Sequence, residues 1–130
     1  MDNITMLRQA YANFATGNVP AVLDVFDPAI EWFECEGMPF VKDNGHYTGH
    51  DAIVQNVFMK IGDYIDGFSI TVSDIFGAGD RVVMEGYYEG TYKPTGKKFK
   101  ANAAHIWTER NGKLIRFFQA VDSAAITGKN

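Results

Sequence analysis

Apolar residues recur every three or four positions near the start of the chain, a spacing typical of an amphipathic helix. The residues that define this first helix are Ile4, Leu7, Tyr11 and Phe14. The helix is expected to end at Gly17-Asn18, because glycine tolerates the left-handed conformation that commonly follows a last helical turn. A third helix is predicted over residues 50–66 from apolar positions that repeat every four residues, namely Ile53, Val57, Ile61 and Ile65.

A second, short helix lies between these two. It is predicted over "VPAVLDVF", residues 19–26, with Pro20 in its first turn and the Asp27-Pro28 pair stopping it. The following segment "AIEWFEC", residues 29–35, has strand character and leads into a loop.

The second half of the chain changes to a period of two, which predicts half-buried strands. Glycine, proline and asparagine turns separate four such segments, residues 68–76, 81–92, 97–109 and 113–122. Three helices followed by a long meander of strands predict an α+β fold: a cone-shaped, curved antiparallel sheet with the three N-terminal helices packed on its concave face. The mouth of such a cone is a natural place for a small-molecule pocket.

The turn "ERNGKL" decides which side chains share the inner face. A two-residue Asn-Gly turn would pair Arg110 with Lys113 and place His105 opposite Phe118. A three-residue loop would pair Glu109 with Lys113 instead, and a slip of one residue exchanges the two faces. The three-residue loop sorts the residues better, because it gives an uncharged inner face of Phe99, Ala101, Ala103, His105, Trp107, Phe117, Gln119 and Val121.

Composition narrows the class of protein. The chain has 130 residues, 46% of them hydrophobic, which is enough for a core and typical of a single domain spanning 1–130. A net charge of −4 argues against a nucleic-acid partner, and no apolar run is long enough for a membrane span. The sequence starts without a signal-peptide pattern and has one cysteine, so a cytoplasmic location is expected.

The order of elements, "YANFATGNVPAVLDVF", then "HYTGHDAI", then "RNGKLIRFFQAVD", resembles the nuclear transport factor 2-like superfamily. Within it the chain is similar to the SnoaL-like branch, which includes polyketide cyclases, ketosteroid isomerases and limonene-epoxide hydrolases. The resemblance covers nearly the whole chain. It implies a cone-shaped α+β fold, often dimeric through the outer sheet face, and leaves the activity open because this fold hosts many functions.

The catalytic residues of the epoxide hydrolases and of the ketosteroid isomerases do not carry over. Positions that match the epoxide-hydrolase device hold Cys35, Gly37, Gly86, Tyr88 and Gln119. The base of the ketosteroid isomerases would fall near Trp32, and their oxyanion-hole acid near Ala103 or Ala104, while Tyr11 lies about one residue from the expected tyrosine. We therefore expect neither of these two activities.

His105 is the first candidate for chemistry, because an unperturbed imidazole titrates near neutrality; the alternative is a core histidine bonded to a backbone carbonyl. Gln119 and Tyr88 complete the predicted catalytic set, with Gly86 and Gly90 expected to open space around Tyr88. The predicted substrate-binding residues are Tyr11, Phe14, Trp32, Cys35, Phe99, Ala101, Ala103, Trp107, Phe117 and Val121.

Other polar groups are assigned structural roles. Glu31, Glu34 and Glu36 form an acidic run that is usually solvated surface. His46 and His50 are four residues apart but lack a third ligand at suitable spacing, so no metal is expected, and no cofactor either. Cys35 is expected to be a small buried hydrophobe, and Asp122 to cap the end of the sheet.

Two functions remain open from the sequence. One is an isomerase, cyclase or dehydratase that transfers a proton on a hydrophobic carbonyl or hydroxyl compound, with His105 as acid and base. The other is a non-catalytic protein that binds an apolar small molecule. A homodimer through the outer sheet face, including Ile106 and Phe118, is expected in either case, because that face mixes apolar residues with charge.

Overall fold

The computed structural model describes residues 2–42 and 44–128. Its elements, in chain order, are α1 (Asn3–Ala15), α2 (Val19–Asp24), β1 (Phe26–Phe33), β2 (His46–Thr48), α3 (His50–Ile53), the π-helix η1 (Val54–Phe58), α4 (Met59–Tyr64), β3 (Ile65–Ala78), β4 (Arg81–Tyr92), β5 (Lys97–Arg110), β6 (Lys113–Val121) and α5 (Ser123–Thr127). The short elements β2 and α5 have no counterpart in the sequence prediction.

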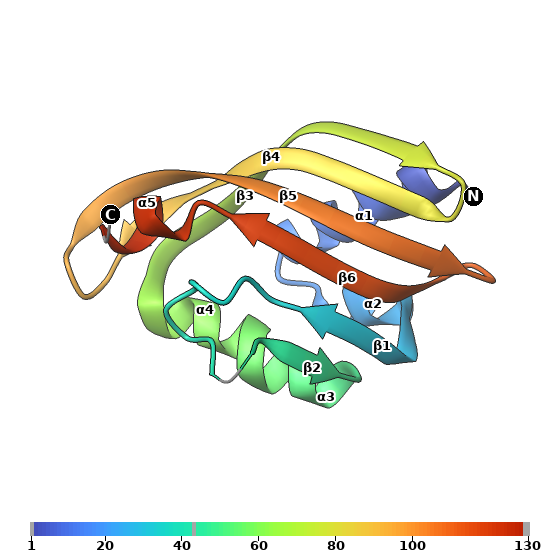
Figure 1. Ribbon diagram of the computed structural model, residues 1–130, viewed down its shortest axis with the longest axis horizontal. Helices are drawn as coiled ribbons and strands as arrows, with labels where there is room; N and C mark the ends of the chain where they lie inside the picture. The colour runs from blue at the N-terminus through green and yellow to red at the C-terminus, as the bar shows by residue number, and fades with distance from the viewer. Residues whose placement is uncertain (1, 43, 129–130) are drawn as a thin grey trace.

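One mostly antiparallel sheet, with strand order β2-β1-β6-β5-β4-β3, forms the body of the molecule. The exception is the β1–β6 pair, which is parallel. The long strands β3 to β6 curve over the helices, with α3 and α4 on one side and α1 and α2 behind the sheet (Figure 1). The predicted α+β fold with a curved sheet is therefore confirmed.

The first helix agrees with its prediction. Asp2 caps its start by accepting a hydrogen bond from the Thr5 amide at 2.8 Å, and the helix ends at Ala15. The second helix was predicted too long. It ends at Asp24, because β1 begins at Phe26 and pairs at once with β6.

The Asp27-Pro28 pair therefore does not stop a helix, as the sequence suggested, but lies inside β1. Proline has no amide proton for a strand ladder, and the register with β6 is interrupted between Phe26 and Glu31. Strand β1 thus starts earlier than predicted and is irregular over its first half.

The predicted third helix is a composite of α3, η1 and α4, and it ends at Tyr64 rather than at residue 66. Its middle turn is π-helical over Val54–Phe58. Single π turns inside α-helices frequently occur at functional sites. Here the turn places Val57 and Phe58 against the cavity described below.

The β5–β6 turn differs from the prediction. Arg110 pairs with Lys113, and Asn111 and Gly112 have φ angles of 54° and 79°, so the turn has two residues rather than three. A β-bulge follows, because Glu109 pairs with Leu114 while Thr108 pairs with Arg116.

The extra residue in β6 restores the predicted face while changing the partners. His105 lies directly opposite Gln119, and Trp107 opposite Phe117, where the three-residue loop had placed Phe117 opposite His105. The inner face is therefore as predicted, and its two central polar side chains are closer together than the predicted register allowed.

The glycines beside Tyr88 were expected to open space, and that expectation is wrong. A Cβ at Gly86 would lie 1.9 Å from the Thr71 carbonyl oxygen, and a Cβ at Gly90 would lie 2.6 Å from Ile65 Cγ2. Both positions let strand β3 approach β4 closely.

Candidate functional site

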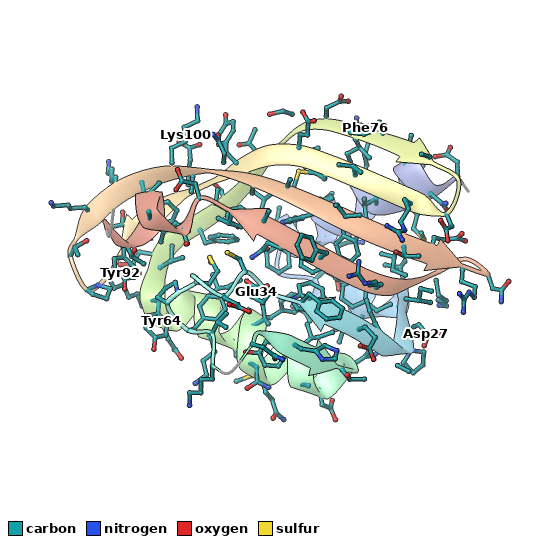
Figure 2. The ribbon with its side chains drawn as sticks, viewed as in Figure 1. Asp27, Glu34, Tyr64, Phe76, Tyr92 and Lys100 are labelled. Carbon is teal, nitrogen blue, oxygen red and sulfur yellow. The ribbon has the colours of Figure 1, made fainter. Side chains whose placement is uncertain are left out.

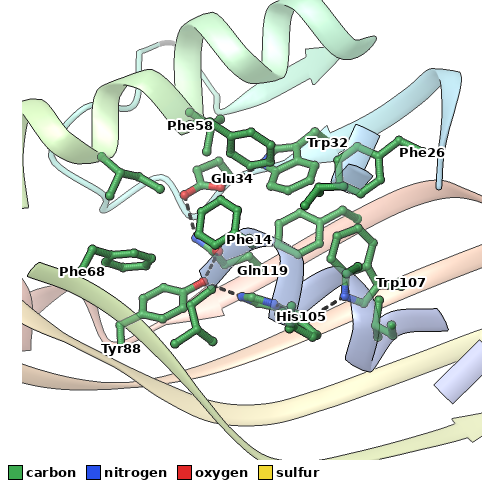
Figure 3. Close-up of a pocket in the computed structure, with 18 of the residues that line it drawn as sticks. Phe14, Phe26, Trp32, Glu34, Phe58, Phe68, Tyr88, His105, Trp107 and Gln119 are labelled. Atoms are coloured by element: carbon green, nitrogen blue, oxygen red, sulfur yellow. Dashed lines mark hydrogen bonds between the residues drawn. The ribbon is translucent and has the colours of Figure 1, made fainter. Parts of the chain in front are cut away.

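A cavity of about 60 Å³ lies between the concave face of the sheet and the helices. Aromatic rings form much of its wall, namely Tyr11, Phe14, Phe26, Trp32, Phe58, Phe68, Tyr88, Trp107 and Phe117. Among the described residues on this wall, the one charged side chain is that of Glu34 (Figure 3). The site is therefore an apolar chamber with a single carboxyl group.

The structure brings most of the predicted site residues together. Those on the cavity wall are Tyr11, Phe14, Trp32, Tyr88, His105, Trp107, Phe117 and Gln119. Five others are not on it: Phe99, Ala101 and Ala103 are buried in the core farther along β5, while Cys35 and Val121 line a second hollow.

Glu34 was expected to be solvated surface, and the structure corrects this. Its side chain is buried, with 6% exposed, and lies between the sheet and the helices (Figure 2). The signal that could have identified it is the period of two in β1, where Ile30 and Trp32 are buried and Glu34 continues the same phase.

Two neighbours hold the Glu34 carboxyl group. Trp32 Nε1 donates a hydrogen bond to Oε1 at 2.9 Å, and Gln119 Nε2 donates one to Oε2 at 2.8 Å. Burial raises the pKa of Glu34 to about 7, although these two hydrogen bonds favour the ionised form. The group can therefore both accept and release a proton near neutrality.

The backbone around Glu34 is fixed by a loop that folds back on it. The Glu34 amide donates to the Gly45 carbonyl oxygen at 2.9 Å. Gly45 has a φ of +74°, and a Cβ there would lie 2.6 Å from the Glu34 carbonyl oxygen. A glycine is therefore required at the point where the loop presses against the acid.

Tyr88, His105 and Gln119 form one hydrogen-bonded group. The Tyr88 hydroxyl donates to Gln119 Oε1 at 2.6 Å, and its oxygen lies 2.5 Å from His105 Nε2. Since the single hydroxyl proton points to Gln119, the Tyr88 oxygen accepts from an Nε2–H of His105. Burial lowers the pKa of His105 to about 3, so the ring is neutral and carries its proton on Nε2.

The group extends through His105 to the first helix. The Tyr11 hydroxyl lies 2.6 Å from His105 Nδ1, the nitrogen left without a proton, and therefore donates to it. Trp107 Nε1 in turn donates to the Tyr11 oxygen at 2.9 Å. Burial raises the pKa of both tyrosines, so their hydroxyl groups remain protonated near neutrality.

These bonds form one directed chain that runs from Trp107 through Tyr11, His105, Tyr88 and Gln119 to Glu34. Each donor points toward the carboxyl group. The hydrogen bonds within such a directed chain polarise and strengthen one another. Within the chain, the second amide proton of Gln119 is the one donor without an assigned acceptor, whereas each carboxylate oxygen of Glu34 keeps an unused lone pair.

Three half-buried rings, from α1, η1 and β3, pack together on the chamber wall. Phe14 of α1 packs edge-on against Phe58, with ring centroids 5.2 Å apart, and against Phe68 of β3 at 6.5 Å. An engineered dry cavity that binds benzene has a volume of about 150 Å³, well above that of this chamber. A ring-sized ligand therefore requires side chains of the chamber wall to move.

The remaining polar candidates have structural partners. His46 Nε2 lies 2.5 Å from Glu31 Oε2, and His50 Nε2 lies 3.0 Å from the Phe26 carbonyl oxygen. Asp122 accepts from the Ala125 amide as the N-cap of α5, so it caps a helix at the end of the sheet. No cluster of three metal-ligating side chains occurs among the described residues.

Within the described part of the chain, no helix has the length and apolarity needed to cross a membrane.

Comparison with known proteins shows the family to which the chain belongs. The SnoaL-like domain family matches residues 7–117, and the chain belongs to it. A nuclear transport factor 2-like protein from Burkholderia thailandensis is 36% identical, with a TM-score of 0.86 over 93% of this chain and 91% of that one.

Two further solved structures were obtained with small molecules. TerC, co-crystallized with polyporic acid, is 27% identical, with a TM-score of 0.83 over 95% of this chain and 93% of that one. A ketosteroid isomerase-like protein from Catenulispora acidiphila in complex with trimethylamine is 16% identical, with a TM-score of 0.78 over 95% of this chain and 90% of that one, and shows the fold alone. No curated protein matches this chain.

Proposed function

We propose that this protein is a cofactor-independent enzyme that transfers a proton on a small, apolar carbonyl or hydroxyl compound, with Glu34 as the acid and base. The reaction class is that of an isomerase, cyclase or dehydratase. The observation that carries the proposal is the buried carboxyl group of Glu34, whose pKa of about 7 matches neutral pH at the wall of an apolar chamber.

His105 takes a different role in this proposal from the one that the sequence suggested. Both of its ring nitrogens are engaged by tyrosine hydroxyls, and its lowered pKa keeps it neutral. A proton donor or acceptor for a substrate needs an accessible nitrogen and a matched pKa. His105 is therefore a positioning residue, which fixes Tyr88 and, through Gln119, the orientation of the Glu34 carboxyl group.

The substrate class follows from the wall. The chamber presents rings and aliphatic side chains, with no lysine or arginine among its described residues to hold an anion. A carbon acid next to a carbonyl group, or a hydroxyl compound, can offer its proton to an unused lone pair of Glu34. The second amide proton of Gln119 is the available donor for oxygen on which negative charge develops.

Deuterium exchange tests the proposal without a known product. A panel of small ketones, cyclic and aryl, is incubated in D2O with the wild-type protein, and deuterium at the carbon next to the carbonyl is followed by NMR. We expect catalysed exchange that rises with pH to a plateau above an inflection near pH 7, since the base form of Glu34 is required. In Glu34→Gln the rate should fall by about 10²- to 10⁴-fold.

Binding is measured separately by intrinsic fluorescence. The two tryptophans of the sequence, Trp32 and Trp107, both lie on the chamber wall, so a bound ligand changes their emission. Glu34→Gln should keep this response. Glu31→Gln, a control in an exposed acid outside the chamber, should keep both binding and exchange. Equal exchange in wild type and Glu34→Gln would contradict the proposal.

The second candidate function is the binding of an apolar molecule without turnover. It is favoured by the directed chain, in which nearly every donor is already used by another side chain and little remains to stabilise a developing oxyanion. Ligand binding by fluorescence without exchange of any panel member would select this function.

We also propose that two copies associate through the outer sheet face. Phe118 of β6 leaves 40% of its surface exposed there, and Ile106 lies directly beside it on β5. Arg116 covers part of this face, with its guanidinium 5.9 Å from the centre of the Phe118 ring. An apolar ring surrounded by polar side chains is typical of a subunit interface.

A further inference from the structure

Glu34 and Gln119 line a second hollow in addition to the apolar chamber. This hollow has a volume of about 430 Å³, and its wall also includes Cys35, Glu36 and Ala120. The two side chains thus separate an inner chamber from an outer one, and the hydrogen bond between Gln119 Nε2 and Glu34 Oε2 crosses this partition.

The outer chamber exists because two paired strands separate. The parallel pairing of β1 with β6 ends at Phe33 and Phe118. The first backbone amide after β1, that of Glu34, donates to the carbonyl oxygen of Gly45 in the loop instead of to β6. Beyond this point the two segments are joined by the side-chain hydrogen bond from Gln119 to Glu34 and not by backbone pairing.

The two chambers differ in their access to water. The residues that line the inner chamber are all buried or half-buried. The outer wall includes the exposed residues Glu36 and Asn44, so it opens to the surface beside the proposed interface, to which Phe118 belongs. A base can return its proton to the product, but exchange of the Glu34 proton with D2O requires contact with water. No exposed residue of the described chain lines the inner chamber to provide that contact.

We infer that the outer chamber is a water site and the proton-exchange route of Glu34: substrate meets the carboxyl group from the inner chamber, and water meets it from the outer one. This inference rests on the proposed role of Glu34 as the base. The ionisable groups around Glu34 are Tyr88 on the inner side, and Cys35 and Glu36 on the outer side.

Hydrogen exchange of the two indole groups tests this without any substrate. Trp32 Nε1 donates to Glu34, whereas Trp107 Nε1 donates to Tyr11 at the far end of the chain of hydrogen bonds. Exchange of both indole protons with D2O is followed by NMR. In Ala120→Phe, which narrows the outer chamber, exchange at Trp32 should slow by about ten-fold or more while exchange at Trp107 stays unchanged.

Two further samples make the result decisive. Ala78→Phe, the same change at an exposed strand position outside both chambers, should leave both rates unchanged. Alkylation of Cys35, the one cysteine of the sequence, fills the outer chamber of the wild-type protein and should reproduce the effect of Ala120→Phe. An unchanged Trp32 rate in both filled forms, or equal slowing at Trp107, would overturn the inference. Neither result depends on catalysis, so deuterium exchange into ketones remains a separate test of the base.

Discussion

Removing the charge of Glu34 should change how the stability of the protein depends on pH. In the fold the pKa of Glu34 is about 7, against a reference value of 4.5. A raised carboxyl pKa means that the folded protein holds the proton more tightly than the unfolded chain does. Between about pH 4.5 and about pH 7 the folded state therefore binds more protons, and its free energy of unfolding falls as the pH rises.

The size of this effect follows from the shift. At about 1.4 kcal/mol for each pH unit, the contribution of Glu34 declines by about 3 kcal/mol across that window. It is fully present below about pH 4.5 and lost above about pH 7. Since domains are stable by only about 5–15 kcal/mol, a change of this size is readily measured.

The assay is denaturant unfolding of wild type and Glu34→Gln at a series of pH values. The difference, wild type minus variant, isolates the carboxyl group, because His105 is present in both proteins. We expect this difference to fall by about 3 kcal/mol between acid and mildly alkaline pH. Glu36→Gln is the matched control, since it removes an exposed carboxyl group from the same segment. A difference that is flat across the range would refute the account of Glu34 as a buried acid.

The remaining predictions concern the hydrogen-bond chain, the sheet and the outer face. Tyr88→Phe should lower the free energy of unfolding by about 1–3 kcal/mol in denaturant experiments, because it leaves two buried partners without a bond; a neutral effect would disprove the directed chain. Gly86→Ala should lower the free energy of unfolding by more than about 2 kcal/mol, since its Cβ would lie 1.9 Å from a carbonyl oxygen of β3. Gly62→Ala, in open space within α4, should raise it by up to about 1 kcal/mol. Asn111→Ala should cost about 1 kcal/mol and Asn111→Gly almost nothing, because the residue has a φ of 54°; equal effects of the two changes would argue against the two-residue turn. Phe118→Ser should shift a dimer toward monomer in sedimentation equilibrium, and a wild-type monomer at micromolar concentration would rule out the proposed interface.

Much of the fold could be predicted from the sequence, because its signals are local. The helical spacing in α1 and the period of two in β4, which spans the predicted residues 81–92, reflect which side of each element is buried. The inner face of β5 and β6 could also be deduced, since one grouping of residues is uncharged. The type of turn that connects them could not be deduced, because a β-bulge beyond the turn shifts the pairing of the two strands by one residue.

The site was only partly visible in the sequence. Tyr88, His105 and Gln119 are isolated polar residues within apolar strands, so each could be recognised as a candidate from its own neighbourhood. Their roles depend on which atoms meet. The neutral state of His105 follows from complete burial between two tyrosines that lie 94 and 17 residues away in the chain.

Glu34 shows most clearly what tertiary structure alone decided. In the sequence it stands in an acidic run and looks like solvated surface. Its burial results from Gln119, which is 85 residues away, and from a loop whose glycine presses on its backbone. Whether a carboxyl group is solvated or desolvated depends on everything packed around it, and desolvation, not residue type, raises its pKa. Periodicity along a chain can indicate which side of a strand faces inward, but only the assembled fold determines how dry that side is and which partners reach it.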